Sequence, residues 1–231
     1  KCIILFSTLS IILISKYSEE LDDEYRAEYN TLLLIILLGM FLMTNSINLV
    51  MIYLSLELVS IPSYVLAGIL KNDKRSNEAS LKYVIFGSFA SGLMLFGFSL
   101  LYGLTGTLNI YEIHNMLLST DNPSAILFSI ILILAGFGYK ISMVPFHYWT
   151  PDVYEGAPTT ITAFLSVAPK AAGFALFLRV FTSVFTEGGS FSSVTPLFNI
   201  SWPMLLAILS AATMTVGNIL ALRQENVKRM L

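Results

Sequence analysis

A lysine and three prolines interrupt an apolar part of the chain in the stretch Gly136-Phe-Gly-Tyr-Lys-Ile-Ser-Met-Val-Pro-Phe-His-Tyr-Trp-Thr-Pro-Asp-Val-Tyr-Glu-Gly-Ala-Pro158. Residues 125–139 carry no charged side chain, as expected of a helix that enters a bilayer. Proline cannot continue a helix without loss of a backbone hydrogen bond. Irregular backbone at membrane depth is tolerated only where it is buried in protein or lines a watery cavity. The stretch therefore predicts a membrane helix that breaks beside Lys140.

The whole chain has the composition of a membrane protein. Of its 231 residues, 55% are apolar and 12% are charged. The apolar residues form blocks, several of them near the roughly 20 residues that cross a bilayer. These blocks cover residues 2–15, 31–44, 47–70, 80–102, 125–145, 160–185 and 201–222. We therefore predict an all-α polytopic membrane protein, a helix bundle with seven crossings, the first truncated, in a single membrane domain over residues 1–231.

The basic residues predict how the helices are oriented. Polar segments separate the blocks at residues 16–30, 44–46, 71–77, 103–124 and 187–193, and residues 223–229 follow the last block. From residue 16 onward, the loop lysines and arginines all fall on one side of the predicted membrane: Lys16, Arg26, Lys71, Lys74, Arg75, Arg223, Lys228 and Arg229. Such a bias marks the cytoplasmic or matrix side. A missed crossing would scatter these residues over both sides.

Five ionisable residues remain inside the apolar blocks or at their edges: Glu57, Lys82, Lys140, Lys170 and Arg179. A charge near the bilayer centre costs at least about 2.5 kcal/mol, so such residues require partners, water or a function. An arginine near a helix end usually extends to the lipid headgroups, and we assign no role to Arg179. The other four are candidate site residues.

Two of the candidates have alternative partners. Glu57 lies near the middle of its block, so its carboxyl is either neutral and hydrogen-bonded to a neighbouring helix or half of an ion pair with a buried lysine. Lys82 follows Glu78 by one helical turn. It either pairs with Glu78 at the membrane interface or is the partner of Glu57. Pro62, five residues after Glu57, can kink that helix.

Three further candidates lie in or near the break. Lys140 either faces a hydrated break or ends its helix at the headgroups. Lys170 follows Pro169 in mid-block, so backbone groups left unpaired by the proline could bind water beside the amine. His147 lies in the broken segment and either relays protons or satisfies a helix end or a loop carbonyl. His114 falls in the polar segment 103–124, where we expect it in water.

One acid and three lysines on separate helices suggest a path for protons. Burial weakens the hold of a lysine on its proton and a nearby carboxylate restores it, so movement of that carboxylate switches the amine. The chain has no nucleotide-binding loop and no dinucleotide fingerprint. Because Cys2 is its only cysteine, it also lacks the cysteines of an iron–sulfur or zinc site. Energy and redox chemistry are therefore expected from partners.

Five segments carry a specific likeness: Leu56-Glu-Leu58, Ser80-Leu-Lys-Tyr83, Gly138-Tyr-Lys140, the run from Pro145 to Thr159, and Ala163-Phe-Leu-Ser-Val-Ala-Pro-Lys170. Together they resemble subunit N of bacterial respiratory complex I, the NADH:quinone oxidoreductase, whose mitochondrial counterpart is subunit 2. The likeness runs over nearly the whole chain. It implies an antiporter-like bundle of about fourteen helices with two inverted five-helix repeats, each containing a broken helix.

On that resemblance, residues 31–185 form the first repeat, with the broken helix near 140–160, and residues 201–231 begin the second. Most of the second repeat is absent from the sequence, which implies a fragment or one piece of a split subunit. The buried glutamate of the family falls on Glu57, its partner lysine on Lys82, the broken-helix lysine on Lys140 and the connecting lysine on Lys170. Lys140 would accept protons and Lys170 would pass them to a central polar axis. Glu57, paired with Lys82 or Lys140, would transmit the state of a neighbouring subunit.

The resemblance also implies the surroundings of the chain. NADH, FMN, iron–sulfur clusters and quinone are expected in partner subunits, with no cofactor or metal in this chain. The partners would be the other membrane subunits of complex I, including neighbouring antiporter-like subunits, and the lipid bilayer, but no nucleic acid. The bacterial plasma membrane is the expected location, and the mitochondrial inner membrane is the alternative. Two other functions stay open, a cation/proton antiporter subunit and a structural subunit whose buried ion pairs hold helices in register.

Overall fold

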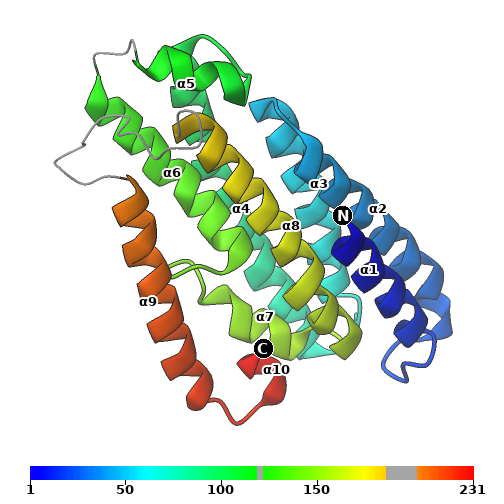
Figure 1. Cartoon of the computed structure of the whole chain (residues 1–231). Coiled ribbons are helices and arrows are strands. Elements are labelled where there is room, and N and C mark those ends of the chain that lie inside the picture. The colour runs from blue at the N-terminus through cyan, green and yellow to red at the C-terminus, as the bar shows by residue number, and fades with distance from the viewer. Residues whose placement is uncertain (119–121, 186–201) are drawn as a thin grey trace.

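The computed structural model describes residues 1–118, 122–185 and 202–231, and within these ranges it contains helices and no strand (Figure 1). The helices are α1 (Cys2–Ser15), α2 (Arg26–Asn45), α3 (Leu49–Ala67), α4 (Lys74–Thr105), α5 (Ile110–Leu118), α6 (Pro123–Ile141), α7 (Trp149–Gly156), α8 (Thr159–Phe185), α9 (Trp202–Leu222) and α10 (Val227–Met230), with a 3₁₀ turn at Asp23–Tyr25. The loop expected at 187–193 lies outside the described residues.

Six of these helices, α2, α3, α4, α6, α8 and α9, are long and apolar enough to cross a membrane. The first apolar block forms α1, whose 14 residues reach only about 21 Å. The predicted all-α membrane fold is therefore confirmed. Its seven crossings are six full-length helices and one short apolar helix within the described part of the chain.

Capping residues extend the helices beyond their apolar blocks. The block at 80–102 is the apolar part of α4, whose 32 residues begin after Asp73. The Asp73 side chain accepts a hydrogen bond from the backbone N–H of Arg75 (2.9 Å), which satisfies one of the free N–H groups of a helix start. Gly106 ends the helix in the left-handed conformation, with φ 69°, where glycine carries no steric cost. The apolar block therefore shows which part of α4 can lie in the membrane, and the capping residues Asp73 and Gly106 show where the helix begins and ends.

The polar segment 103–124 contains a helix that the sequence analysis missed. In α5, Ile110, Ile113 and Leu117 are buried, at the spacing of one helical face. His114 lies on the same face and is only 7% exposed. Its Nδ1–H donates to the backbone oxygen of Val184 (2.9 Å). The prediction that His114 lies in water was therefore wrong, because α5 packs against α8.

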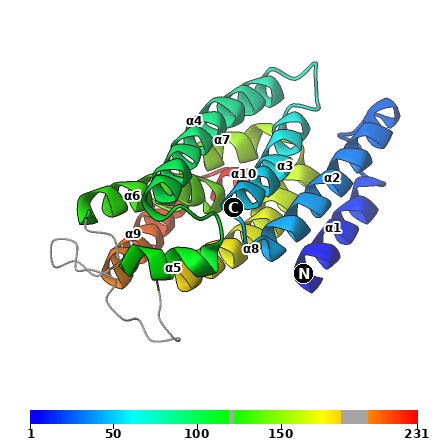
Figure 2. The same cartoon turned by 90° about the horizontal axis from the view of Figure 1, so that it is seen from above.

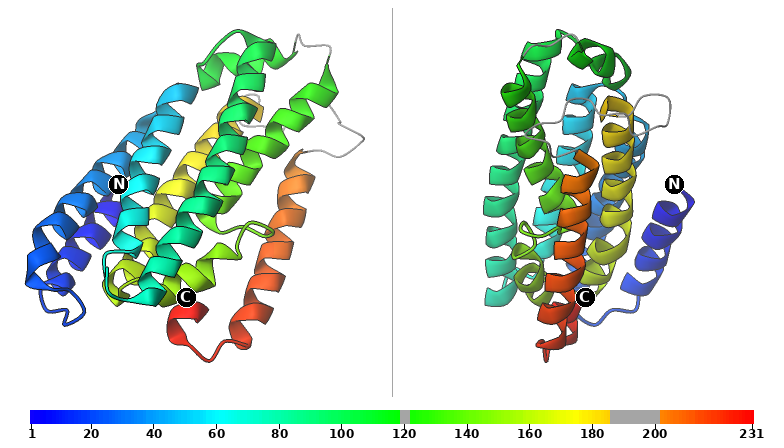
Figure 3. Two further views of the ribbon diagram at one scale, coloured as in Figure 1. Left: turned by 180° about the vertical axis from the view of Figure 1, so that it is seen from behind. Right: turned by 60° about the vertical axis from the view of Figure 1, so that its left-hand side comes forward.

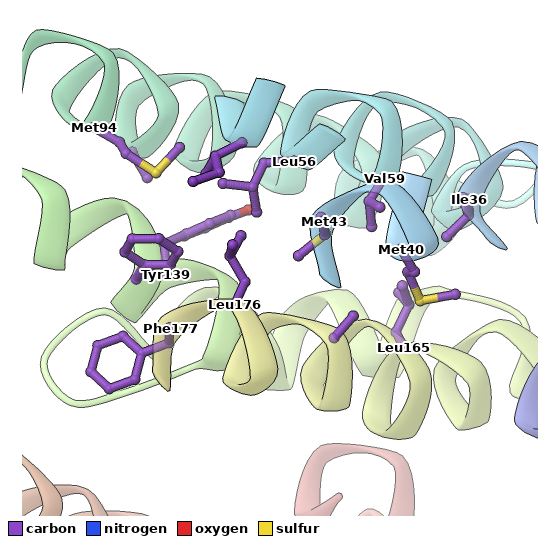
Figure 4. Packing of buried hydrophobic residues seen from close by; sticks show 14 of the residues in the cluster. Ile36, Met40, Met43, Leu56, Val59, Met94, Tyr139, Leu165, Leu176 and Phe177 are labelled. Atoms are coloured by element: carbon purple, nitrogen blue, oxygen red, sulfur yellow. The ribbon is translucent and has the colours of Figure 1, made fainter. Parts of the chain in front are cut away.

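Helix α8 occupies the middle of the bundle. It contacts α1, α2, α3, α5, α6 and α7, while α4 packs against α3, α6 and α7, and the view from above shows this arrangement (Figure 2). Side chains from α2, α3, α4, α6 and α8 meet in one apolar core, where Met43, Leu56, Met94, Tyr139 and Leu176 approach one another (Figure 4). Helix α9 lies at the edge of the bundle (Figure 3). The interior prolines Pro62 and Pro169 lie within continuous helices, α3 and α8.

The three basic segments lie at one end of the bundle, with α7 and α10, and α5 lies at the other end (Figures 1 and 3). The ammonium of Lys71 lies 4.5 Å from the centroid of the Tyr25 ring, which joins the first basic segment to the second. The third segment reaches the same end, because the Lys228 ammonium donates to the backbone oxygen of Ala157 (3.0 Å). The predicted grouping of the basic loops on one side is therefore confirmed.

Two glycines of α4 provide a matched test of this packing. A Cβ on Gly97 would lie 2.9 Å from the backbone oxygen of Ser129 and 3.0 Å from the backbone nitrogen of Ile133 in α6, whereas a Cβ on Gly92 would meet nothing within 4 Å. We expect Gly97→Ala to lower the free energy of unfolding by about 1–3 kcal/mol, because backbone cannot yield as a flexible side chain does. Gly92→Ala should be neutral or stabilising by up to about 1 kcal/mol. Thermal unfolding in detergent measures both, and equal midpoints would contradict the tight α4–α6 contact.

Candidate functional site

The predicted break lies between α6 and α7. Helix α6 ends at Ile141 and α7 begins at Trp149. Ser142 follows α6 in the left-handed conformation (φ 58°, ψ 41°), and the Val144–Pro145 peptide bond is cis. Pro151 lies in the first turn of α7, where a backbone N–H has no helical partner to lose. The chain is therefore non-helical between Ile141 and Trp149, as the prolines predict.

The backbone of the break is hydrogen-bonded by protein groups. The indole N–H of Trp149 donates to the backbone oxygen of Tyr139 (3.1 Å), one of the carbonyls freed at the end of α6. The Tyr139 hydroxyl in turn donates to the backbone oxygen of Tyr83 in α4 (3.0 Å). From the other side, the Thr213 hydroxyl of α9 accepts from the backbone N–H of Val144 (3.1 Å). The break thus satisfies the requirement that irregular backbone at membrane depth be buried in protein.

Lys140 is buried inside the protein. It occupies the last turn of α6 and is 7% exposed. Its ammonium donates to the Ser60 hydroxyl of α3 (3.0 Å), and Ser60 donates to the backbone oxygen of Leu56 (2.7 Å). On the side of α8, a Cβ on Gly173 would lie 3.6 Å from Cγ of Lys140. The structure thus favours the buried alternative for Lys140, and hydration of the break stays a prediction.

Glu57 is half-buried on α3 and accepts a hydrogen bond from the Ser91 hydroxyl of α4 (2.5 Å). Within the described residues, no lysine or arginine nitrogen lies within 4.0 Å of its carboxylate. The carboxyl of Glu57 is therefore hydrogen-bonded to Ser91 and forms no salt bridge within the described residues.

Lys82 belongs to a different group of charges. Its ammonium lies 2.6 Å from Oδ2 of Asp152 in α7 and 2.8 Å from Oε1 of Glu78. Arg229 of α10 completes the group, with 3.1 Å to Asp152 and 2.6 Å to Glu155. We call Glu78, Lys82, Asp152, Glu155 and Arg229 the surface cluster. They line a polar cavity of about 260 Å³.

The contacts in the surface cluster decide between the two interpretations of Lys82. Lys82 pairs with Glu78, as one of the two interpretations held, and it does not reach Glu57 in this structure. Asp152 is the partner that the sequence analysis missed. The signal for it was present, because an acid directly after Pro151 lies in the first turn of a new helix, where carboxylates are favoured.

Lys170 points toward the break from α8. Its ammonium donates to the Ser142 hydroxyl (2.7 Å) and lies 5.5 Å from the centroid of the Tyr154 ring. The Thr150 hydroxyl, at the start of α7, also donates to Ser142 (2.7 Å). The structure therefore brings Lys170 and the break together through two hydroxyls that the sequence analysis did not single out.

His147 is placed in the break without a hydrogen bond to a lysine. Its Nδ1 is buried and has no hydrogen-bond partner within the described residues, and its ring centroid lies 5.8 Å from that of Tyr148. Its backbone oxygen accepts from the N–H of Thr150 (3.0 Å). A relay role for His147 stays a prediction. Within the ranges that the structure describes, no group of histidine, cysteine and acidic residues could hold a metal ion.

Comparison with known proteins gives one consistent family. Residues 46–231 match the family model described as NADH:quinone oxidoreductase/Mrp antiporter, transmembrane. The chain is 50% identical over 236 residues to NADH-quinone oxidoreductase subunit N 2 of Chloroherpeton thalassium, covering 100% of this chain and 45% of that protein. It is 45% identical over 232 residues to NAD(P)H-quinone oxidoreductase subunit 2 of Prochlorococcus marinus, covering 100% and 42%. The chain thus spans less than half the length of these relatives.

Two solved structures share the fold. One is respiratory complex I from Thermus thermophilus with bound aureothin, with a TM-score of 0.78 and 31% identity over 99% of this chain and 45% of the matched chain. The other is the membrane-bound sulfane sulfur reductase, an archaeal respiratory membrane complex, with a TM-score of 0.78 and 27% identity over 99% and 44%.

A double-mutant cycle tests the partner of Lys82. Because Lys82 contacts Asp152, we expect Lys82→Gln and Asp152→Asn to show a coupling of about 0.2–1 kcal/mol in the free energy of unfolding, the range of partly exposed pairs. Lys82→Gln and Glu57→Gln should be additive, since their side chains do not touch. Unfolding in detergent measures both cycles. Coupling in the second cycle and none in the first would assign Lys82 to Glu57 instead.

Proposed function

Because the chain belongs to the family of NADH:quinone oxidoreductase and Mrp antiporter transmembrane subunits, we propose that it is the proton-translocating part of subunit N of a respiratory NADH:quinone oxidoreductase. One observation carries the proposal. Lys140 is buried at the end of a broken helix with a neutral hydroxyl as its hydrogen-bond partner. A lysine that is not locked into a close ion pair can exchange its proton during a cycle.

The buried groups lie on separate elements around the break. Lys140 ends α6, Lys170 reaches the break from α8, and Glu57 lies on α3. Glu57 lies on the same helix as Ser60, the hydrogen-bond partner of Lys140, and has no lysine or arginine nitrogen within 4.0 Å among the described residues. A small shift of α3 against α6 would therefore change how firmly Lys140 holds its proton. In this mechanism Lys140 accepts a proton, Lys170 carries it onward, and Glu57 couples the pair to a neighbouring subunit.

Lys82 has a supporting role in this mechanism. Its contacts join α4 to α7 at the end of the bundle that carries the basic loops. The surface cluster thus holds the short helix that follows the break, and the proton path itself needs Glu57, Lys140 and Lys170. This differs from the role of direct partner to Glu57 that the family resemblance implied for Lys82.

The energy for transport would come from other subunits. Moving one charge against 100 mV costs about 2.3 kcal/mol, and the relatives are named for NADH–quinone chemistry. NADH, FMN, iron–sulfur clusters and quinone are accordingly assigned to partner subunits. The neighbouring antiporter-like subunits are the expected contacts of this chain. The bacterial and archaeal sources of the relatives and structures reported above support a plasma-membrane location.

The internal repeat remains part of the proposal. Within residues 31–185, the membrane elements are α2, α3, α4, the broken pair α6 and α7, and α8. This is the number expected of one five-helix repeat with one broken member. Residues 201–231, whose described part holds α9 and α10, would begin the inverted second repeat.

Two other functions have less support. A cation/proton antiporter subunit is the second candidate, because the matched family model covers both groups. A structural subunit held in register by buried ion pairs is disfavoured, because neither Lys140 nor Lys170 has a carboxylate within 4.0 Å among the described residues. Sodium-dependent exchange in vesicles without NADH would favour the antiporter.

Substitution of Lys140 tests the proposed function. In the full-length subunit within its complex, Lys140→Ala should abolish the contribution of this subunit to the proton yield per NADH, because no other amine occupies the end of α6. Lys74→Ala is the matched control, since Lys74 is an exposed lysine at the start of α4, and it should keep the parental yield. NADH-driven acidification of closed vesicles, normalised to NADH oxidation, measures both. An unchanged yield in Lys140→Ala would defeat the proposal.

A further inference from the structure

Ser142 combines an uncommon backbone conformation with two side-chain hydrogen bonds. It is the one non-glycine residue with positive φ in the part of the chain that the structure describes. Glycine or asparagine usually takes this position after a helix, because a Cβ is unfavourable there. A residue held in such a conformation beside a candidate site suggests a functional reason for its side chain.

The hydroxyl of Ser142 is not used to cap its own helix. The backbone N–H of Ser142 closes the end of α6 on the oxygens of Gly138 and Tyr139. Its side-chain oxygen accepts instead from the Lys170 ammonium and from the Thr150 hydroxyl, each at 2.7 Å. Thr150 is 9% exposed. The two hydroxyls therefore form a short chain from Lys170 on α8 to the start of α7.

We infer that Ser142 and Thr150 are a two-hydroxyl proton relay that loads and unloads Lys170 at the break. This inference rests on the proposed proton translocation and adds two residues to it. A hydroxyl both donates and accepts a hydrogen bond, so it can receive one proton while it releases another. An amide or an apolar side chain of similar size cannot do both in one step.

The proton balance of the relay is complete. An N–H bond of the Lys170 ammonium breaks as the oxygen of Ser142 takes that proton. Because Thr150 donates to Ser142 in the structure, both hydroxyls must first rotate so that Ser142 donates to Thr150. The original hydroxyl proton of Ser142 then passes to the oxygen of Thr150, and the original hydroxyl proton of Thr150 passes to a water molecule at the break. Lys170 ends as a neutral amine, each hydroxyl ends with one proton, and the water carries the charge. The reverse sequence loads Lys170.

The alternative is that Ser142 only holds Lys170 in place. Three substitutions separate the alternatives in the full-length subunit within its complex. Ser142→Ala removes the hydroxyl and keeps the Cβ. Ser142→Gly removes the hydroxyl and relaxes the backbone, because glycine adopts φ 58° freely, so a folding defect cannot explain a loss shared by both. Thr150→Val removes the second hydroxyl with little change of shape.

Ser129→Ala is the matched control. Ser129 is a buried serine of α6 whose hydroxyl donates to the backbone oxygen of Ile126 in the same helix (2.7 Å). It carries a hydroxyl but touches neither lysine through a hydrogen bond in the described structure. Its substitution should keep the parental proton yield per NADH and the parental amount of assembled complex.

If Ser142 and Thr150 form a relay, their variants should change the proton yield per NADH in a pattern that is not expected if Ser142 only positions Lys170. Ser142→Ala, Ser142→Gly and Thr150→Val should each lower the proton yield per NADH to the level of Lys140→Ala, with normal assembly on native gels. Because the two hydroxyls act in series, the double variant Ser142→Ala/Thr150→Val should be no lower than either single variant. The readout is acidification of closed vesicles per NADH oxidised.

Two results would overturn the relay. One is a parental yield in Ser142→Gly or in Thr150→Val, and the other is an additive loss in the double variant with a reduced amount of assembled complex. If Lys140→Ala lowers the yield in the same experiment, either result removes the relay and leaves the proposed function intact. If Lys140→Ala has no effect, the proposed function fails, and the relay fails with it.

Discussion

The hydrogen bonding of the backbone between α6 and α7 is the constraint on which the rest of the structure depends. A helix that stops within an apolar layer leaves carbonyl and N–H groups that lipid cannot satisfy. Here Trp149 binds the oxygen of Tyr139, Tyr139 binds that of Tyr83, and Thr213 binds the N–H of Val144. The stacked rings of Tyr83 and Trp149, with centroids 4.6 Å apart, place α4 beside the start of α7.

Two lysines are held by hydroxyls beside the break. Because α6 stops at Ile141, Lys140 lies at its buried end and reaches α3 through Ser60. Because Ser142 turns the chain away from the helix, its hydroxyl is available to Lys170 of α8. Both amines are held by hydroxyls, which accept a hydrogen bond but do not neutralise the charge. Among the described residues, each lysine is thus hydrogen-bonded to a hydroxyl and has no carboxylate within 4.0 Å.

Sequence alone predicts much of this arrangement. Block lengths, proline positions and loop charges indicate the membrane helices, the break and the shared side of the basic loops, because each depends on local chemistry and on bilayer thickness. Lys140 and Lys170 can be singled out in the same way, since a lysine inside an apolar block is costly. Each of these features can be recognised from the residues of a single block or loop, without knowing which distant residues contact it.

The features that were missed depend on contacts between distant residues. The bond from Lys82 to Asp152 joins positions 70 residues apart, and Glu78 offered a local partner that concealed it. Helix α5 has nine residues, too few for its apolar face to stand out within a polar segment. Ser142 and Thr150 are ordinary residues in sequence, and only the left-handed turn after α6 brings their hydroxyls to Lys170.

Lys140 and Lys170 are held by internal hydroxyls at the break, and we expect this part of the protein to be hydrated. The most direct measurement is a high-resolution cryo-electron microscopy map of the full-length subunit in its complex, with ordered water visible. We expect density for Lys140 at Ser60, for Lys170 at Ser142, and for water beside Thr150. A Lys140 side chain extended to the lipid headgroups, with a dry break, would contradict this expectation.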